Sequence, residues 1–334
     1  MAETKILYGG QAVIEGVMMR GRRYVGCAVR RASGEITLHA EPLPKSVYVG
    51  FWTRIPFLRA LTVLWDTLIL GTRMLMFSAN LQVADELKKE AQEHPAGPGQ
   101  ERETARRMEM AVQPVGAAPG DPERPLPPAA VYGTLAVSLA LGVGLFFVLP
   151  LLIVRPLESR ISPFFSNLIE GLIRFGLFLG YLVLISRLAE IRRIFQYHGA
   201  EHKTIAAYEA GSELTPDLIQ HYGKEHPRCG TGFLLTVVVV SIFVFALLGP
   251  LPFWVRLASR VVLIPVVAAI SYELIRFSSQ HRNIFIFDWL VSRPSLWLQS
   301  LTTREPEPAM IQVAVAALRR VQQEEQNVQV PPSK

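Results

Sequence analysis

The sequence has few cysteines and lacks the motifs of several common enzyme classes. Only two of its 334 residues are cysteines, Cys27 and Cys229, so we do not expect a disulfide-stabilised secreted domain. It contains no phosphate-binding Gly-Lys-Ser/Thr loop, no dinucleotide-binding fingerprint and no Gly-x-Ser-x-Gly motif. ATP-driven transport and serine hydrolysis by those routes are therefore unsupported. The first thirty residues lack an apolar stretch with a cleavage site, so we expect no removable signal peptide.

What the sequence does contain is a large apolar fraction, gathered into long blocks. Half of the residues are hydrophobic, and the mean hydropathy is +0.27. The formal net charge is +6. Because Arg and Lys flank the apolar blocks, we expect contact with membrane lipids and no binding of nucleic acid. A block of about 20 apolar residues can cross a bilayer. Four such spans are predicted: 130–154, 167–188, 231–254 and 257–277.

The segments before the first span have different patterns. Short alternating runs punctuated by glycines over residues 5–41 predict a small β-rich unit with a hairpin turn at Ser33-Gly34. Residues 55–80 form a helical block in which Arg59, Asp66 and Arg73 recur every seven residues. A charge at the centre of a bilayer costs about 2.5–3.5 kcal/mol. We therefore interpret this block as an amphipathic helix that lies in the membrane interface.

The predicted fold class is an α-helical polytopic membrane protein with about four transmembrane helices, an amphipathic interfacial helix and a small N-terminal β-rich unit. Its segments are the β-rich unit (1–50), the interfacial helix (51–81), a flexible linker (82–128), transmembrane helices 1–2 (129–188), a His-rich cap (189–230), transmembrane helices 3–4 (231–278) and a C-terminal segment (279–334). Residues 306–326 of the last segment predict an amphipathic helix with one apolar face: Ile311, Val315, Leu318 and Val321.

The charges also predict a topology. An even number of spans places both termini on one side, and the Arg- and Lys-rich loop 189–230 favours the cytoplasmic side of a bacterial cytoplasmic membrane. Two charged pairs lie near span ends: Glu170 with Arg174, and Glu273 with Arg276. We interpret both as local pairs whose polar ends extend toward the interface, rather than as an ion pathway.

The residues most suggestive of chemistry are His198, Glu201 and His202, in the cap. Two histidines four apart on a helix face the same direction, so both can bind one metal ion. The His-x-x-Glu-His order matches the inverted zincin arrangement, in which the histidines bind zinc and the glutamate activates water. Glu209 lies on the same stripe, but it is about 10 Å further along a straight helix and is not expected to share the ion.

A further ligand is predicted from the turn-prone segment His226-Pro227-Arg228-Cys229-Gly230. His226 and Cys229 are both candidates, because zinc accepts imidazole nitrogen and thiolate sulfur. If both joined the two cap histidines, the four-ligand shell would be closed and structural. If one position stayed open, the site would favour catalysis.

Three motifs resemble the YqhQ family, a bacterial membrane family of unknown function that is sometimes labelled a predicted metal-dependent enzyme. They are Gly9–Arg20 (GGQAVIEGVMMR), Tyr197–Lys203 (YHGAEHK) and His226–Thr231 (HPRCGT). The resemblance covers about residues 5–320, and 302–306 (TTREP) also looks like the family's ending. It implies no substrate, but it supports treating the second and third motifs as one site.

We therefore expect a metal-dependent membrane hydrolase in which a divalent ion, zinc or similar, is held by His198, His202 and one of His226 or Cys229. Glu201 is the expected general base. The first alternative is a non-enzymatic membrane scaffold or assembly factor with a structural metal, which would bind a membrane-protein partner or form a homo-oligomer. The second alternative is a transporter that uses the charged residues of the spans.

Overall fold

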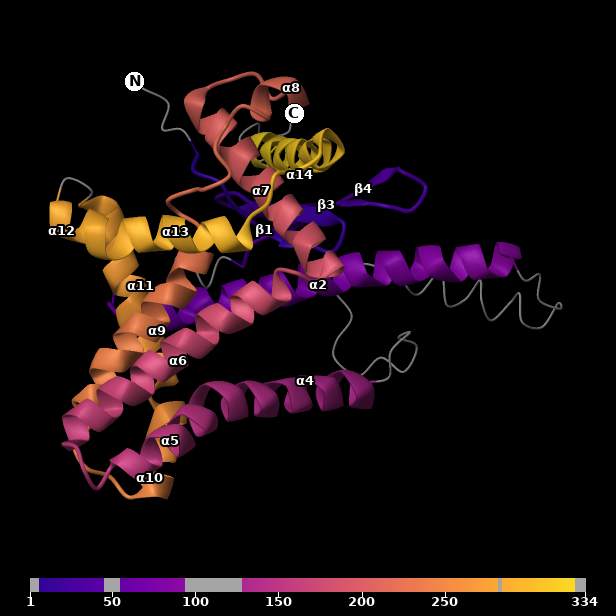
Figure 1. Cartoon of the computed structure of the whole chain (residues 1–334). Helices are drawn as coiled ribbons and strands as arrows, with labels where there is room; N and C mark the ends of the chain where they lie inside the picture. Colours follow the sequence, from indigo (N-terminus) through magenta and orange to yellow (C-terminus); the bar gives the residue numbers. More distant parts are fainter. Residues whose placement is uncertain (1–5, 45–54, 94–127, 282–283, 328–334) are drawn as a thin grey trace.

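The structure is a computed structural model of the chain (Figure 1), and it describes residues 6–44, 55–93, 128–281 and 284–327. It is mostly helical, with a small antiparallel sheet at the N-terminus. Most of the predicted linker, residues 94–127, lies outside the described residues.

The predicted β-rich unit is a four-stranded antiparallel sheet with the order β1-β2-β3-β4. Its strands are β1 (Gly9–Val13), β2 (Gly16–Arg20), β3 (Tyr24–Arg30) and β4 (Ile36–Pro42). The predicted turn at Ser33-Gly34 joins β3 to β4. In the register, Met18 lies opposite Cys27 and Met19 opposite Gly26. Successive side chains point to opposite faces, so Met18 and Met19 enter different cores.

Helices cover both faces of the sheet. One face, which includes Met18 and Cys27, packs on α2 (Leu58–Glu93). The other face, which includes Met19 and Ala28, packs on α14 (Pro308–Asn327) and α7 (Ala189–Ala210). Figure 1 shows the sheet between α2 and these two helices. The C-terminal helix was predicted correctly, because its four apolar positions are all buried: Ile311, Val315, Leu318 and Val321.

The helix α2 is longer than the predicted interfacial helix. It extends to Glu93, because residues 82–93 are mostly strong helix formers such as Ala, Leu, Glu and Lys. By length and composition, Leu58–Glu90 is one of the helices that could cross a membrane. Near its start, Arg59 Nε donates a 2.7 Å hydrogen bond to Glu273 on α11 (Ile264–Gln280). Glu273 thus has a partner from a distant part of the chain, besides an electrostatic interaction with Arg276, its predicted local partner.

Three helices in the described part of the chain are apolar and long enough to cross a membrane: Leu58–Glu90, Ala136–Leu157 and Pro163–Ile185. A fourth is possible by length and composition if α10 (Phe253–Val262) and α11 form one span, although they meet at a 44° bend. Pro265 in the first turn of α11 provides a reason for the bend, because proline cannot donate a helical hydrogen bond.

The predicted span 231–254 is wrong in length. The helix α9 (Thr231–Ala246) has 16 residues, which is about 24 Å against an apolar bilayer thickness of about 30 Å. The apolar run continues, but Gly249, with φ +36°, and the two prolines that follow it end the helix. α9 packs between α6 (Pro163–Ile185), α11 and α13 (Arg293–Thr302).

A proline also shapes the apolar helix Ala136–Leu157. α4 (Pro128–Val143) and α5 (Leu149–Val154) are joined by the π-helical segment η2 (Gly144–Val148). Pro150 has no N–H to donate to the carbonyl of Phe146, four residues earlier. Arg174 Nε on α6 donates to that carbonyl instead, at 2.8 Å. The side chain of one apolar helix thus satisfies the irregular backbone of another.

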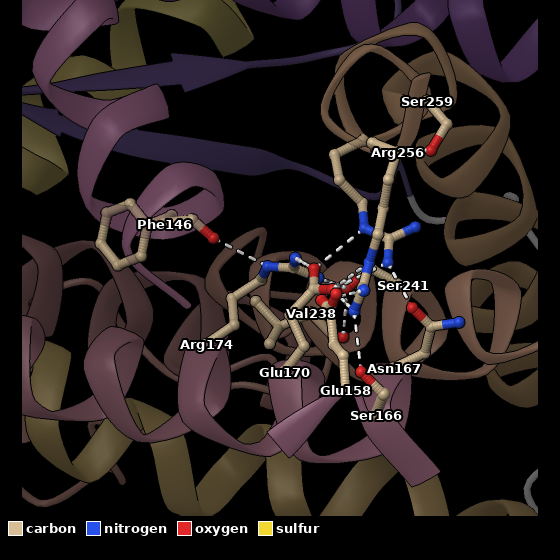
Figure 2. A network of polar contacts seen from close by, with 11 residues as sticks. Phe146, Glu158, Ser166, Asn167, Glu170, Arg174, Val238, Ser241, Arg256 and Ser259 are labelled. Atoms are coloured by element: carbon tan, nitrogen blue, oxygen red, sulfur yellow. Dashed lines mark hydrogen bonds and ion pairs between the residues drawn. The ribbon is translucent and has the colours of Figure 1, made fainter. Parts of the chain in front are cut away.

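The expectation that the polar ends of Glu170 and Arg174 extend toward the interface is wrong. Arg174 Nη2 does donate to Glu170 Oε1, at 2.6 Å, but both side chains are buried. Glu170 also accepts hydrogen bonds from Arg256 and Arg260 of α10, with shortest distances of 2.8 Å. Figure 2 shows the carboxylate of Glu170 between the guanidinium groups of Arg174 and Arg256. Glu158 binds the outer side of Arg256 at 2.5 Å.

Candidate functional site

The helix α7 carries the His-Gly-Ala-Glu-His motif at the junction of the sheet and the apolar helices. Glu201 and His202 are buried, with exposed fractions of 3% and 1%. The extended segment that follows α13 crosses α7 at Gly199, where an added Cβ would lie 2.1 Å from the carbonyl oxygen of Arg304. Glycine in the motif is therefore required by close packing, and it lets the segment 302–304 approach the histidines.

The structure brings three of the predicted ligands together. His198, His202 and Cys229 each offer one ligand atom, and these three atoms all lie within 4.8 Å of one another. His198 Nε2 lies 3.2 Å from Cys229 Sγ, and the two imidazole ring centroids are 4.3 Å apart. The two histidines come from consecutive turns of α7, whereas Cys229 comes from the loop just before α9.

Backbone carbonyl groups orient both imidazoles. His198 Nδ1 lies 2.9 Å from the carbonyl oxygen of Thr302, and His202 Nδ1 lies 2.6 Å from that of Lys224. A carbonyl oxygen only accepts hydrogen bonds, so each Nδ1 carries a proton, and Nε2 is the ring nitrogen that can offer a lone pair to an ion. A hydrogen bond from the ring nitrogen that does not bind the ion is typical of metal-binding histidines. Thr302 and Lys224 were not predicted, because carbonyl groups carry no mark in the sequence.

The fourth candidate, His226, has a different environment. Its Nε2 lies 3.4 Å from Glu209 Oε2, and it does not belong to the three-residue group found among the described residues. The amide of Gln299 fixes the backbone of His226, because it accepts from the N–H at 2.7 Å and donates to the carbonyl at 3.0 Å. Glu209, which we expected to be too far along the helix to share the ion, instead contacts His226 and Arg228.

Burial dominates the electrostatics of the site. Desolvation raises the pKa of Glu201 to about 8 and lowers the pKa of His202 to about 2. It also raises the pKa of the Cys229 thiol, although hydrogen bonds to Thr231 and Gly232 act in the opposite direction. Without a cation, the pocket therefore favours the neutral form of each group. A bound metal ion would reverse this preference at the carboxyl and thiol groups.

A cavity of about 270 Å³ lies beside these residues. The cap contributes Glu201, His202 and Cys229 to its wall. The β-rich unit forms another part of the wall, from Tyr8 to Gln11 together with Met18 and Arg20, and α2 adds Thr67 and Leu70. The site is thus enclosed by segments from three distant parts of the sequence.

The β-rich unit is fastened to α7 by specific contacts. Glu15, which has a positive φ of 53° in the turn between β1 and β2, accepts hydrogen bonds from Arg193 and from the hydroxyl of Tyr197. Gly10 lies directly against Glu201, because an added Cβ would be 2.6 Å from its Cγ. The glycine-rich motif at residues 9–21 therefore covers the site, a role that its spacing alone did not predict.

Comparisons with known proteins agree with this description and assign no activity. A family profile described as "Protein of unknown function (DUF1385)" matches residues 55–324. The chain is 34% identical over 317 residues to "Uncharacterized protein YqhQ" of Bacillus subtilis (strain 168), covering 94% of this chain and 92% of that protein. No solved structure matches. The resemblance drawn from the three motifs is confirmed, and the chain belongs to the uncharacterised DUF1385 family that includes YqhQ.

Proposed function

We propose that this protein is a metal-dependent hydrolase of the bacterial cytoplasmic membrane, in which His198, His202 and Cys229 bind zinc or a similar divalent ion. The proposal is carried by one observation. The three ligand atoms converge within 4.8 Å beside a cavity whose wall also contains Glu201.

The donor set fits such an ion. Two imidazole nitrogens that can offer a lone pair and one sulfur are ligands that zinc prefers. In a tetrahedral site with ordinary bond lengths, nitrogen and sulfur ligands lie about 3.6 Å apart. His198 Nε2 and Cys229 Sγ are 3.2 Å apart, so a small outward movement of either side chain admits the ion.

Glu201 has the position of a general base. A bound zinc ion acts as a Lewis acid and lowers the pKa of water at an open coordination position. Glu201 Oε2 lies 3.5 Å from His202 Nε2 and faces the cavity. Its carboxylate can accept a proton from water that attacks an ester or amide carbon, and can return that proton to the leaving group.

The contacts of His226 favour a hydrolase over a scaffold. A shell of three histidines and Cys229 would be closed, but His226 Nε2 is directed at Glu209. Three ligands leave a position for water or substrate, which is the arrangement of catalytic zinc sites. The transporter alternative loses its support, because Glu170 is enclosed by arginines and Glu273 is bound to Arg59.

The test is the metal content of detergent-purified protein, measured by mass spectrometry after incubation with zinc and removal of free ion. We expect about one equivalent in the wild type and in the matched control His226→Ala. We expect loss of the metal in the double variant His198→Ala/His202→Ala and in Cys229→Ala. An absence of zinc from the wild type would overturn the proposal.

A second measurement separates catalysis from metal binding. Glu201→Gln keeps the shape of the side chain and removes its ability to accept a proton. We expect this variant to retain zinc and to lose hydrolysis of a panel of amphiphilic esters and amides by 100-fold or more, on the order expected for a general base. Equal hydrolysis by the wild type and the variant would exclude Glu201 as the base.

A further inference from the structure

The cavity beside Glu201 adjoins a helix that is apolar enough to cross a membrane. Thr67 and Leu70 of α2 form part of its wall, and α2 is apolar enough to cross a membrane. Three apolar side chains of the same turns, Trp65, Leu68 and Ile69, are exposed by 67%, 62% and 43%. Exposed apolar side chains on such a helix are suited to contact with lipid. The cavity therefore adjoins a lipid-facing helix.

Short helices at one end of the apolar bundle lie at the same level as the cavity. α12 (Phe285–Phe287), η4 (Asp288–Ser292) and α13 lie across the ends of α9 and α11 (Figure 1). Their aromatic side chains Phe285, Trp289 and Trp297 are more than half exposed. Aromatic residues, tryptophan above all, concentrate where a membrane meets water. Because α13 ends at Thr302, which orients His198, the ligands lie close to the helix that carries Trp297.

The charge of the cavity indicates the chemistry of its occupant. Two guanidinium groups line it, those of Arg20 and Arg228, and Arg228 is ion-paired with Glu209. Arg20 Nη1 is held by the hydroxyl of Thr67 at 3.4 Å, which directs it along α2. Arginine forms charge-assisted hydrogen bonds with phosphate and carboxylate. The volume of about 270 Å³ is slightly below the range of about 300–1,000 Å³ for ligand pockets and suits a headgroup.

We propose that the cavity binds the phosphate headgroup of an anionic membrane lipid, with Arg20 as its binding group and the acyl chains along the exposed face of α2. The inference deepens the proposed function, since it makes a membrane amphiphile the substrate class of the same site. Arg20 is a positioning residue: it holds the headgroup beside Glu201 and exchanges no proton.

The test uses delipidated protein in detergent, with thermal unfolding as the readout. The probes are short-chain phosphatidylglycerol, short-chain phosphatidylcholine and inorganic phosphate. We expect phosphatidylglycerol to raise the unfolding temperature in a saturable way, and the other two probes to have little effect. In Arg20→Ala, phosphatidylglycerol should bind about tenfold more weakly or worse, because a charge-assisted contact is lost. Arg20→Lys should bind with intermediate affinity.

The matched control is Arg22→Ala, which removes an exposed arginine from the same hairpin. We expect it to bind phosphatidylglycerol like the wild type. Three results would overturn the proposal: equal stabilisation by phosphatidylcholine, equal stabilisation by inorganic phosphate, or unchanged lipid affinity in Arg20→Ala. Failure here is distinguishable from failure of the metal site, because zinc content is measured on the same samples. The metal-free variant His198→Ala/His202→Ala should still bind the lipid.

Discussion

The buried carboxylate of Glu170 offers a sharp test of how the apolar helices are held together. It accepts hydrogen bonds from three guanidinium groups, those of Arg174, Arg256 and Arg260. The side chains of Arg174 and Arg260 are exposed by only 4% and 0%, and that of Arg256 by 10%. In Glu170→Ala these charges would stay buried and would repel one another. We therefore expect a loss of about 3–5 kcal/mol in the free energy of unfolding.

The assay is thermal unfolding of purified protein in detergent, followed by the loss of monodisperse material on size-exclusion chromatography. A loss of this size corresponds to a decrease on the order of 10 °C in the transition temperature. The matched control is Glu158→Ala, which also removes a carboxylate bound to Arg256. Because the Glu158 side chain is 40% exposed, solvent screens the pair, and we expect a loss below about 1 kcal/mol.

Two results would refute this reasoning. The first is an effect of Glu170→Ala as small as that of Glu158→Ala, since the two variants differ chiefly in burial. The second is a failure of compensation. In Glu170→Ala/Arg260→Leu, one buried charge is removed and an apolar side chain takes its place, so part of the lost stability should return. A double variant less stable than Glu170→Ala would show that repulsion is not the cause.

Two further predictions concern the sheet. Gly10→Ala should lower the free energy of unfolding by about 1–3 kcal/mol, because its Cβ would lie 2.6 Å from Glu201 Cγ. The control is Gly9→Ala, whose added Cβ meets open space. An equal loss of stability in the control would contradict the packing argument. In a Cys229→Ser variant, buried Cys27, with a pKa raised to about 12, is almost entirely a neutral thiol at pH 8. Intact-mass measurement should show alkylation of Cys27 only after denaturant is added, whereas prompt alkylation of the folded protein would refute its burial.

The parts of the fold with a regular apolar period could be predicted from the sequence. The short apolar runs of β2 and β3 predicted strands, and the apolar stripe on α14 identified the face of that helix that is buried. The predicted span extended beyond the end of α9. The length of an apolar run does not indicate where helix breakers such as Gly249 and Pro250 end a helix. Arg174 was predicted as a partner of Glu170, but Arg256 and Arg260 could not be, because their contacts depend on how α10 folds back onto α6.

The candidate site could also be predicted only in part from the sequence. The spacing of His198 and His202 predicted that both face one point, and the structure agrees. The sequence could not show which of His226 and Cys229 lies beside the two cap histidines, because both are in one loop. It depends on Gln299, which fixes the backbone of His226 from α13, and on Glu209, which attracts its imidazole. Such long-range contacts leave no periodic pattern in a single sequence.

The same contacts couple the proposed metal site to the assembly of the whole protein. The ligand atoms come from α7 and from the loop before α9, and the carbonyl groups that orient them come from Lys224 and Thr302. An unfolded chain does not hold these groups together, so an ion that binds there binds the folded state. At a free concentration 100 times the dissociation constant, such binding adds about 2.7 kcal/mol to the free energy of unfolding. This gain is comparable to the loss of about 3–5 kcal/mol predicted for Glu170→Ala. A metal ion bound by the cap and a buried carboxylate among the apolar helices would therefore stabilise the two ends of one bundle to a similar degree.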